Sequence, residues 1–224
     1  MTFDAHTLAR EYPRLYHMAE PGAWPSIQKY GLLSTTSLLD LFEISGAHRK
    51  AIEAQHRPDS VPISHPMYGT AVVRDQKPMS DGALEKCLLD GLTPADWYRL
   101  LNRHVFFWLS RQRLNRLLGA RAYRQQRHTI LEVETTTLLD VYAKRIVLAP
   151  INSGSTIMNP QPRGKATFQA IGSYPYDEWR RKRGRRDAIV ELAVRGGVQN
   201  IGRFVLRVTE EGAGRDAKVL YEAS

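Results

Sequence analysis

Two ionisable side chains interrupt apolar segments of this chain, and both could take part in chemistry. His17 lies in a short strand predicted near the N-terminus, and Glu191 lies within the apolar run 188–194. Because side chains alternate along a strand, Glu191 is expected to share a face with Ile189 and Ala193. A carboxylate among apolar neighbours must be paired, hydrogen-bonded or functional, since burying an isolated charge is costly.

Each of these two residues also has a structural interpretation. A histidine in an apolar strand is commonly a core residue with one ring nitrogen hydrogen-bonded, and the face that carries Glu191 could be exposed to solvent.

A third segment adds to the chemical interpretation. The run 105–109 is the clearest predicted strand, with Phe107 and Trp108 in it and Ser110 directly after it. In a mixed sheet, these three strands could line one cleft.

Length and composition predict one domain over residues 1–224, with 210–224 as a frayed tail. The chain has 224 residues, of which 42% are apolar, and this suffices for a core. No apolar run approaches the ~20 residues of a membrane span, and the first residues lack the features of a signal peptide. Cys87, the single cysteine, is expected to be a buried thiol in a reducing, cytoplasmic compartment.

The positive charge predicts a polyanionic partner. The chain carries 32 Lys and Arg against 23 Asp and Glu, which gives a net charge of +9. Six cations follow Trp179 within seven residues: Arg180, Arg181, Lys182, Arg183, Arg185 and Arg186. Such density favours phosphate binding, because like charges repel unless an anion lies between them. A second basic set spans residues 111–127, with Arg113 and Arg116 on one helix face, and could be solvated surface.

Periodicity, caps and breaker residues predict the secondary structure. Helices are expected at 7–14, 25–30, 36–42, 46–55, 81–89, 93–101 and 112–118, with a helical turn at 136–142. Gly31 is expected to end the second of these helices, and Thr93 to cap the sixth together with Asp96. Strands are expected from residue 15 and at 105–109, 129–135, 145–149, 188–194 and 203–208. Residues 61–73 are expected to be extended or looped, and 152–172 to be a loop of functional length. Helices thus concentrate in the first half and strands in the second, which predicts an α+β fold.

The order of a histidine strand, an aromatic strand and a late glutamate strand resembles the ADP-ribosyltransferase fold, and most closely the DarT-type enzymes that ADP-ribosylate DNA bases. The runs 15–17, 25–27 and 31–34 are similar to that family's first strand and the helix after it. Val105–Trp108 resembles its aromatic strand without the family's proline, and 191–198 is similar to its glutamate strand and turn. The resemblance implies split, mixed β-sheets with NAD bound across the split.

The resemblance also implies roles for individual residues. His17 would hydrogen-bond the nicotinamide ribose, and Glu191 would hydrogen-bond the ribose hydroxyl beside the anomeric carbon as nicotinamide departs. Arg74 completes the implied catalytic set, and Arg74 and Arg163 are the candidates for holding the diphosphate. The further residues implied to contact NAD are Tyr16, Phe107, Trp108, Ser110 and Arg163. Those implied to contact nucleic acid are Asn159 and Lys165, at the acceptor, and the six cations of 180–186, along its backbone.

The implied function is transfer of ADP-ribose from NAD to a nucleic-acid base or nucleotide. Two alternatives stay open: the same fold acting on a protein, a small molecule or an RNA 2′-phosphate, and a non-catalytic module that binds nucleic acid through its charge. The sequence contains no metal-ligand spacing, P-loop or Gly-x-Ser-x-Gly elbow, so no metal is expected. It leaves open the acceptor, the oligomeric state, any antitoxin or hydrolase partner, and whether the protein acts as a toxin.

Overall fold

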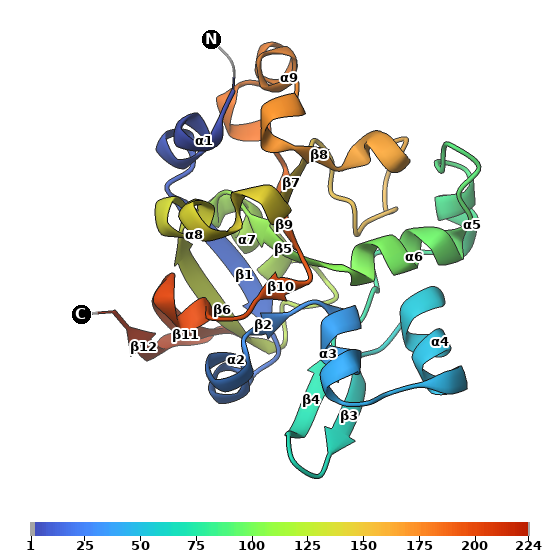
Figure 1. Ribbon diagram of the computed structural model, residues 1–224, viewed down its shortest axis with the longest axis vertical. Coiled ribbons are helices and arrows are strands. Elements are labelled where there is room, and N and C mark those ends of the chain that lie inside the picture. The colour runs from blue at the N-terminus through green and yellow to red at the C-terminus, as the bar shows by residue number, and fades with distance from the viewer. Residues whose placement is uncertain (1–2, 224) are drawn as a thin grey trace.

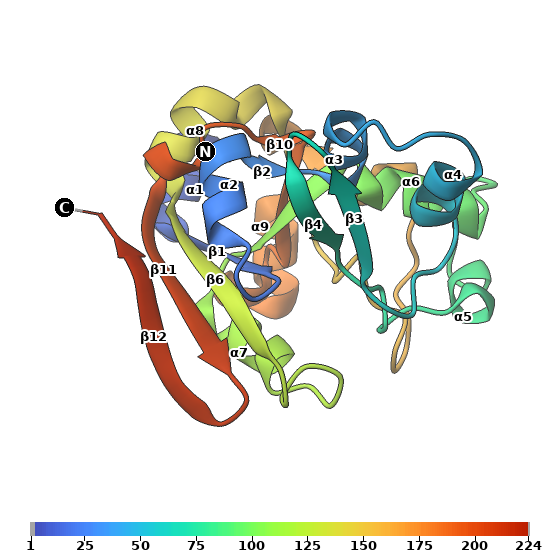
Figure 2. The same cartoon turned by 90° about the horizontal axis from the view of Figure 1, so that it is seen from below.

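The computed structural model describes residues 3–223, and its centre is an eight-stranded sheet (Figures 1 and 2). In order along the sheet, its strands are β12 (Arg215–Glu222), β11 (Val205–Gly212), β6 (Arg127–Glu134), β1 (Arg14–Ala19), β5 (His104–Trp108), β9 (Glu191–Arg195), β7 (Ile146–Ala149) and β8 (Gln169–Ala170). Two small sheets pair β2 (Leu32–Leu33) with β10 (Gly197–Val198) and β3 (Val61–His65) with β4 (Gly69–Val73).

The described α-helices surround this sheet. They are α1 (Ala5–Glu11), α2 (Trp24–Tyr30), α3 (Thr35–Leu41), α4 (Gly46–Ala54), α5 (Asp81–Glu85), α6 (Pro94–Asn102), α7 (Arg111–Leu118), α8 (Thr135–Tyr142) and α9 (Tyr176–Arg183). The first six precede β5, in line with the expected concentration of helices early in the chain. The predicted α+β class is confirmed, with antiparallel pairing throughout the large sheet where mixed pairing was expected.

The large sheet consists of two halves that meet at one residue pair. Strand β1 pairs with β6 along Arg14–Ala19, and β5 pairs with β9 along its whole length. Between β1 and β5, the register within the described residues contains one pair, Tyr16 with Trp108. Beyond it the strands separate, and the side chain of His17 bridges them by a hydrogen bond to the carbonyl oxygen of Phe106. The split therefore lies between β1 and β5.

The main hydrophobic core is built by α1, α8 and the large sheet, which lie together in Figure 1. Leu8 of α1 and Leu138 of α8 pack in one cluster with Leu131 and Val133 of β6, and all four are fully buried. Burying each such side chain contributes about 1.5–3 kcal/mol relative to leaving it in water. This core fixes the positions of β1 and β6, which form one side of the split, relative to the helices α1 and α8.

Residues 35–103 form a group of elements beside the large sheet, on the right of Figure 1. Two small hydrophobic clusters hold together α3, α4, the β3–β4 hairpin, α5 and α6. Arg57 joins these elements, since its buried guanidinium donates to the carbonyl oxygen of Ile52 and, at 3.0 Å, to the side chain of Asn102 on α6. Its Nε also donates to the carbonyl oxygen of Arg74 at 3.2 Å, which fixes the backbone at Arg74.

Local signals in the sequence set several helix ends as predicted. Helix α2 ends at Gly31, whose φ is 93°, and a Cβ at this position would collide with the backbone of Gln199. Helix α6 begins with a capping box, in which Thr93 and Asp96 satisfy each other's free backbone N–H groups. Cys87 is buried, also as predicted.

Other strand predictions need correction. The predicted tail 210–224 is part of the β11–β12 hairpin as far as Glu222, because these strands extend the large sheet, and Ser224 lies outside the described residues. The alternating pattern of 129–135 indicates a half-exposed strand, but β6 is more buried than that, because it lies inside the sheet between β1 and β11. Strand β9 begins at Glu191, so Ile189 precedes the strand and does not share its face with Glu191.

Candidate functional site

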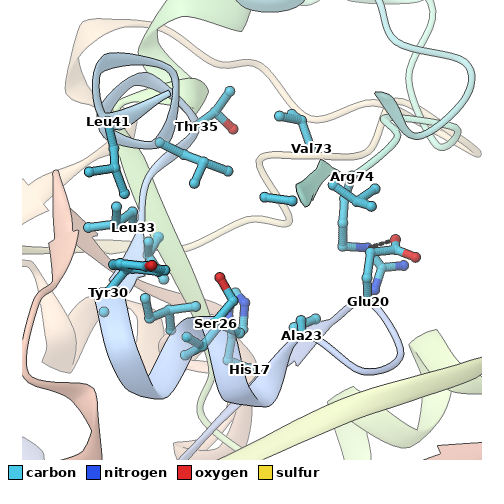
Figure 3. Close-up of a pocket in the computed structure, with 18 of the residues that line it drawn as sticks. His17, Glu20, Ala23, Ser26, Tyr30, Leu33, Thr35, Leu41, Val73 and Arg74 are labelled. Atoms are coloured by element: carbon cyan, nitrogen blue, oxygen red, sulfur yellow. Dashed lines mark ion pairs between the residues drawn. The ribbon is translucent and has the colours of Figure 1, made fainter. Parts of the chain in front are cut away.

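Two adjoining cavities flank His17 where the sheet splits. The first, of about 420 Å³, lies among α2, α3 and β4, and we call it the hairpin cavity (Figure 3). The second, of about 270 Å³, reaches Glu191, and we call it the glutamate cavity. The residues that line both are His17, Met18, Thr35, Arg74, His104 and Phe106. Because the cavities share this wall, we describe them together as the cleft.

The hydrogen bond of His17 fixes which ring nitrogen carries the proton. Its Nδ1 lies 2.8 Å from the carbonyl oxygen of Phe106. A carbonyl oxygen can only accept, so Nδ1 must donate and Nε2 keeps a lone pair. Burial lowers the pKa of His17 to about 4, and the nearby positive charge of Arg74 acts in the same direction. Within the cleft, His17 is therefore a neutral group that accepts hydrogen bonds through Nε2.

We expect His17 to stay neutral between about pH 5 and pH 8, with its proton on Nδ1. The long-range ¹H–¹⁵N spectrum of the imidazoles, assigned with a His17→Gln variant, measures both properties. Protonation of His17 within this pH range would contradict this account of its environment.

Glu191 is held at the floor of the glutamate cavity by Ser153. It is the first residue of β9, is 5% exposed, and lies opposite Trp108 of β5. Its Oε2 accepts from the backbone N–H of Ser153 at 3.1 Å and from the hydroxyl at 2.6 Å. The other oxygen, Oε1, makes no hydrogen bond within residues 3–223. One oxygen thus orients the carboxylate, and the other is available to a ligand.

Burial raises the pKa of Glu191 to about 7. The two hydrogen bonds from Ser153 act against this shift, as do the positive charges of Arg163 and Arg113. Of the two interpretations of Glu191 that the sequence allows, a hydrogen-bonded carboxylate and a solvent-exposed one, the structure has the buried, hydrogen-bonded form. A carboxylate whose pKa is near neutrality can both stabilise positive charge and accept a proton.

Arg74 presents an unsatisfied donor in the cleft. Its Nε lies 3.4 Å from the Glu20 carboxylate, and its guanidinium stacks over Tyr123 at 5.4 Å from the ring centre. Its Nη2 is buried and has no hydrogen-bond partner in the described part of the chain. Figure 3 shows Arg74 beside Glu20, across the hairpin cavity from Leu33. A buried guanidinium N–H without a partner is costly, and an anionic ligand in the cleft would satisfy it.

The structure brings some of the other predicted NAD contacts to the cleft and not others. Phe107 and Trp108 both line the glutamate cavity. Tyr16 lines neither cavity, although Trp108, its register partner on β5, lines the glutamate cavity. Ser110 also lies outside the cleft, because its hydroxyl accepts from the backbone N–H of Arg113 and caps α7.

Arg163 is an anchor for the loop before it, which corrects its predicted role as a phosphate ligand. It is 1% exposed and lines neither cavity of the cleft. Its guanidinium donates to the carbonyl oxygens of Ser153 and Ser155, both at 2.9 Å, and of Gln161 at 3.1 Å. It thereby shapes the loop that carries Ser153 to Glu191.

The basic run 180–186 lies away from the cleft, on the end of α9 and the turn that follows. Several of its cations are used locally. Lys182 pairs with Glu178 at 2.6 Å, Arg185 pairs with Glu11 at 2.6 Å, and Arg186 donates to Gln112 at 2.8 Å. Arg183 donates to the carbonyl oxygen of Pro150 and lies over the ring of Trp179. Cations in the last turn of a helix also stabilise its dipole, which accounts for much of this run.

Trp179, the residue before this run, is partly buried and packs against the main core, so it anchors α9 to the domain. The two predicted acceptor contacts also lie apart from each other. Asn159 is exposed at the tip of the loop, and Lys165 lines a separate cavity with Phe168. Sequence reasoning missed Ser153, because nothing in the loop 152–172 distinguishes it from the other small polar residues there.

The fold and the site define an α+β protein with a carboxylate, a neutral histidine and an arginine gathered at the split of an antiparallel sheet. The chain belongs to DUF7002, a family of unknown function, which it matches over residues 13–205. No curated protein and no solved structure matches it. None of the helices in residues 3–223 has the length and apolar character needed to cross a membrane.

Proposed function

We propose that this protein is an NAD-dependent ADP-ribosyltransferase that transfers ADP-ribose to a nucleic-acid base or nucleotide and releases nicotinamide. The observation that carries the proposal is the cleft itself, in which Glu191, His17 and Arg74 converge from three separate segments. The resemblance of these segments to the DarT-type enzymes supports the same conclusion. Neither the convergence of these residues nor the resemblance of their segments depends on the overall positive charge of the chain.

The chemical character of the cleft fits NAD as the substrate. The free Nη2 of Arg74 suits an oxygen of the diphosphate, because a guanidinium is a strong donor to phosphate. The Nε2 of His17 can accept from a ribose hydroxyl, and Trp108 offers an aromatic wall to nicotinamide, whereas Phe107 is 1% exposed and packs in the main core. The hairpin cavity, with an apolar side that includes Leu33, then receives the adenosine half.

The proposed reaction is a substitution at C1′ of the nicotinamide ribose. The bond from C1′ to the nicotinamide nitrogen breaks, and its electron pair leaves with nicotinamide. A nitrogen of the acceptor forms the new bond to C1′, and the proton it loses passes to Glu191 or to water. Glu191 stabilises the positive charge that develops on the sugar by hydrogen-bonding the adjacent hydroxyl, which is where such a carboxylate accelerates the reaction.

Nicotinamide release from NAD tests this proposal. The wild-type protein is incubated with NAD alone, with single-stranded DNA, with RNA and with a protein lysate, and the modified fraction is identified by mass spectrometry. Release with modified nucleic acid supports the proposal. Modified protein or small molecules with untouched nucleic acid would support a related transferase with another acceptor. Absence of release under every condition, with the protein folded, would contradict the enzyme assignment.

Replacing Arg74 by glutamine should weaken NAD binding about 10–100-fold, since a hydrogen bond to a charged group contributes about 1.5–3 kcal/mol. Titration calorimetry with NAD measures the dissociation constant. Arg207→Gln, on β11 and 47% exposed, is the matched control and should bind NAD as the wild type does. An unchanged dissociation constant in a folded Arg74→Gln protein would remove Arg74 from the proposed site.

A further inference from the structure

A third cavity adjoins the glutamate cavity and shares no lining residue with the hairpin cavity. It has a volume of about 690 Å³ and lies between the segment from α7 to Tyr123 and the loop 152–158. It shares with the glutamate cavity the residues Pro78, Trp108, Leu117, Tyr123 and Asn152. We call it the basic groove. A molecule bound in it would therefore reach Glu191 through a different cavity from the one that receives the adenosine half of NAD.

The basic groove is lined by cations that form few ion pairs with the described part of the protein. Its lining includes Lys77, Arg113, Arg116 and Arg121 and no Asp or Glu. Arg116 and Arg121 are exposed and form no ion pair within residues 3–223. Lys77 has a distant carboxylate partner, Asp75, at 3.9 Å. This differs from the run 180–186, where several cations already have local partners.

Arg113 links the groove to the carboxylate. It pairs with Asp187, but its Nε is buried and has no hydrogen-bond partner among the described residues. Its positive charge also acts on Glu191. An acceptor phosphate near Arg113 would therefore satisfy a donor that the fold leaves free.

Apolar side chains lie along the same groove. Trp108 forms its inner boundary with the glutamate cavity, while Ile157 and Met158 are 60% and 90% exposed at the loop. Exposed apolar and aromatic groups alternating with cations suit a ligand that has both flat rings and phosphates. A purely acidic peptide such as poly-glutamate would use the cations but not this apolar surface.

We infer that the basic groove binds a segment of single-stranded nucleic acid, with phosphates on Lys77, Arg116 and Arg121 and one base directed past Trp108 toward Glu191. A single strand suits this site because Glu191 is 5% exposed and a base stacked within a duplex would first have to be flipped out to reach it. The chemistry on that base rests on the proposed function, but the binding does not. The groove, and not the run 180–186, is then the main nucleic-acid interface.

Binding of a labelled oligonucleotide tests the inference. The probes are fluorescent single-stranded DNA and RNA of about 12 nucleotides, measured by anisotropy without NAD. The double variant R116E/R121E should lose at least about tenfold in affinity and show a shallower dependence on salt, because two phosphate contacts are removed. The matched control is R180E/R181E, which changes the net charge by the same amount on exposed residues of α9 and should lose much less.

Three results would overturn the inference: equal losses in the two double variants, no loss in R116E/R121E, or tighter binding of poly-glutamate than of the oligonucleotides. The last result would indicate an acidic protein acceptor. Nicotinamide release, assayed in parallel, separates this inference from the proposed function. Selective loss of oligonucleotide binding without any release by the wild type would leave the groove standing as an interface and contradict the enzyme. Nicotinamide release that is the same in R116E/R121E as in the wild type would support the enzyme and contradict the groove as the site of the nucleic acid.

Discussion

Replacing Glu191 by glutamine should reduce nicotinamide release about 10²–10³-fold, the loss typical when one preorganised electrostatic group is removed from an active site. Glutamine has nearly the same shape and can still accept from Ser153, so the change removes the charge and leaves the packing. The measurement is the rate of nicotinamide release under single-turnover conditions. Glu85→Gln, an exposed residue at the end of α5, is the matched control and should retain full activity.

The pH dependence gives this prediction a second readout. Because the pKa of Glu191 is raised to about 7, the carboxylate is mostly protonated in acid, and activity should rise with pH through about 7. The same shift lowers stability as the pH rises from about 4.5 to about 7, because over this range the unfolded chain ionises at its ordinary pKa of 4.5 while the native state stays protonated; above about pH 7 the full loss remains.

The Glu191→Gln variant should therefore gain stability over the wild type at about pH 8 and gain little at about pH 5, with the difference on the order of 3 kcal/mol. Urea denaturation at the two pH values measures it. A variant that is less stable than the wild type at both pH values would show that Glu191 serves the fold. Full activity of a folded variant would remove it from the mechanism.

Replacing Arg163 by methionine should destabilise the protein by about 3 kcal/mol and also abolish activity. Methionine fills much of the same volume but leaves three carbonyl oxygens without their donor in a buried site. Because Ser153 is one of these anchored residues, the loop would no longer orient Glu191. Arg163→Lys should fail nearly as badly, since a single ammonium group cannot reproduce the fork of the guanidinium.

Urea denaturation measures the free energy of unfolding of both variants. Arg99→Met, on α6 and 43% exposed, is the control and should change it by less than about 0.5 kcal/mol. If the methionine variant were as stable as the wild type, the loop would be held by something other than Arg163. If it were unstable but fully active, Ser153 would not depend on the loop for its position.

Features encoded by neighbouring residues could be predicted from the sequence. The capping box at Thr93, the end of α2 at Gly31 and the aromatic strand each depend on a few consecutive residues, and the structure has them where predicted. The placement of His17 and Glu191 on strands, and the α+β class, follow from the same local patterns.

Features that depend on tertiary contacts could not be predicted in this way. The partner of Glu191 is Ser153, 38 residues earlier, and its loop is held by Arg163. The density of cations at 180–186 is visible in the sequence, whereas the basic groove draws Lys77 and Arg116 from distant segments. The densest group of cations in the sequence, 180–186, therefore lies at the end of α9. The cations of the basic groove, which adjoins the glutamate cavity, are dispersed along the chain.

The single residue pair that joins β1 to β5 leaves few backbone hydrogen bonds across the middle of the sheet. Each half keeps its own ladder, and the main hydrophobic core, which includes Leu131 of β6 and Leu192 of β9, holds the two halves together. Side-chain packing therefore supplies at the split the cohesion that backbone hydrogen bonds supply elsewhere in the sheet. A ligand that contacts both walls of the cleft would add a further link between the halves.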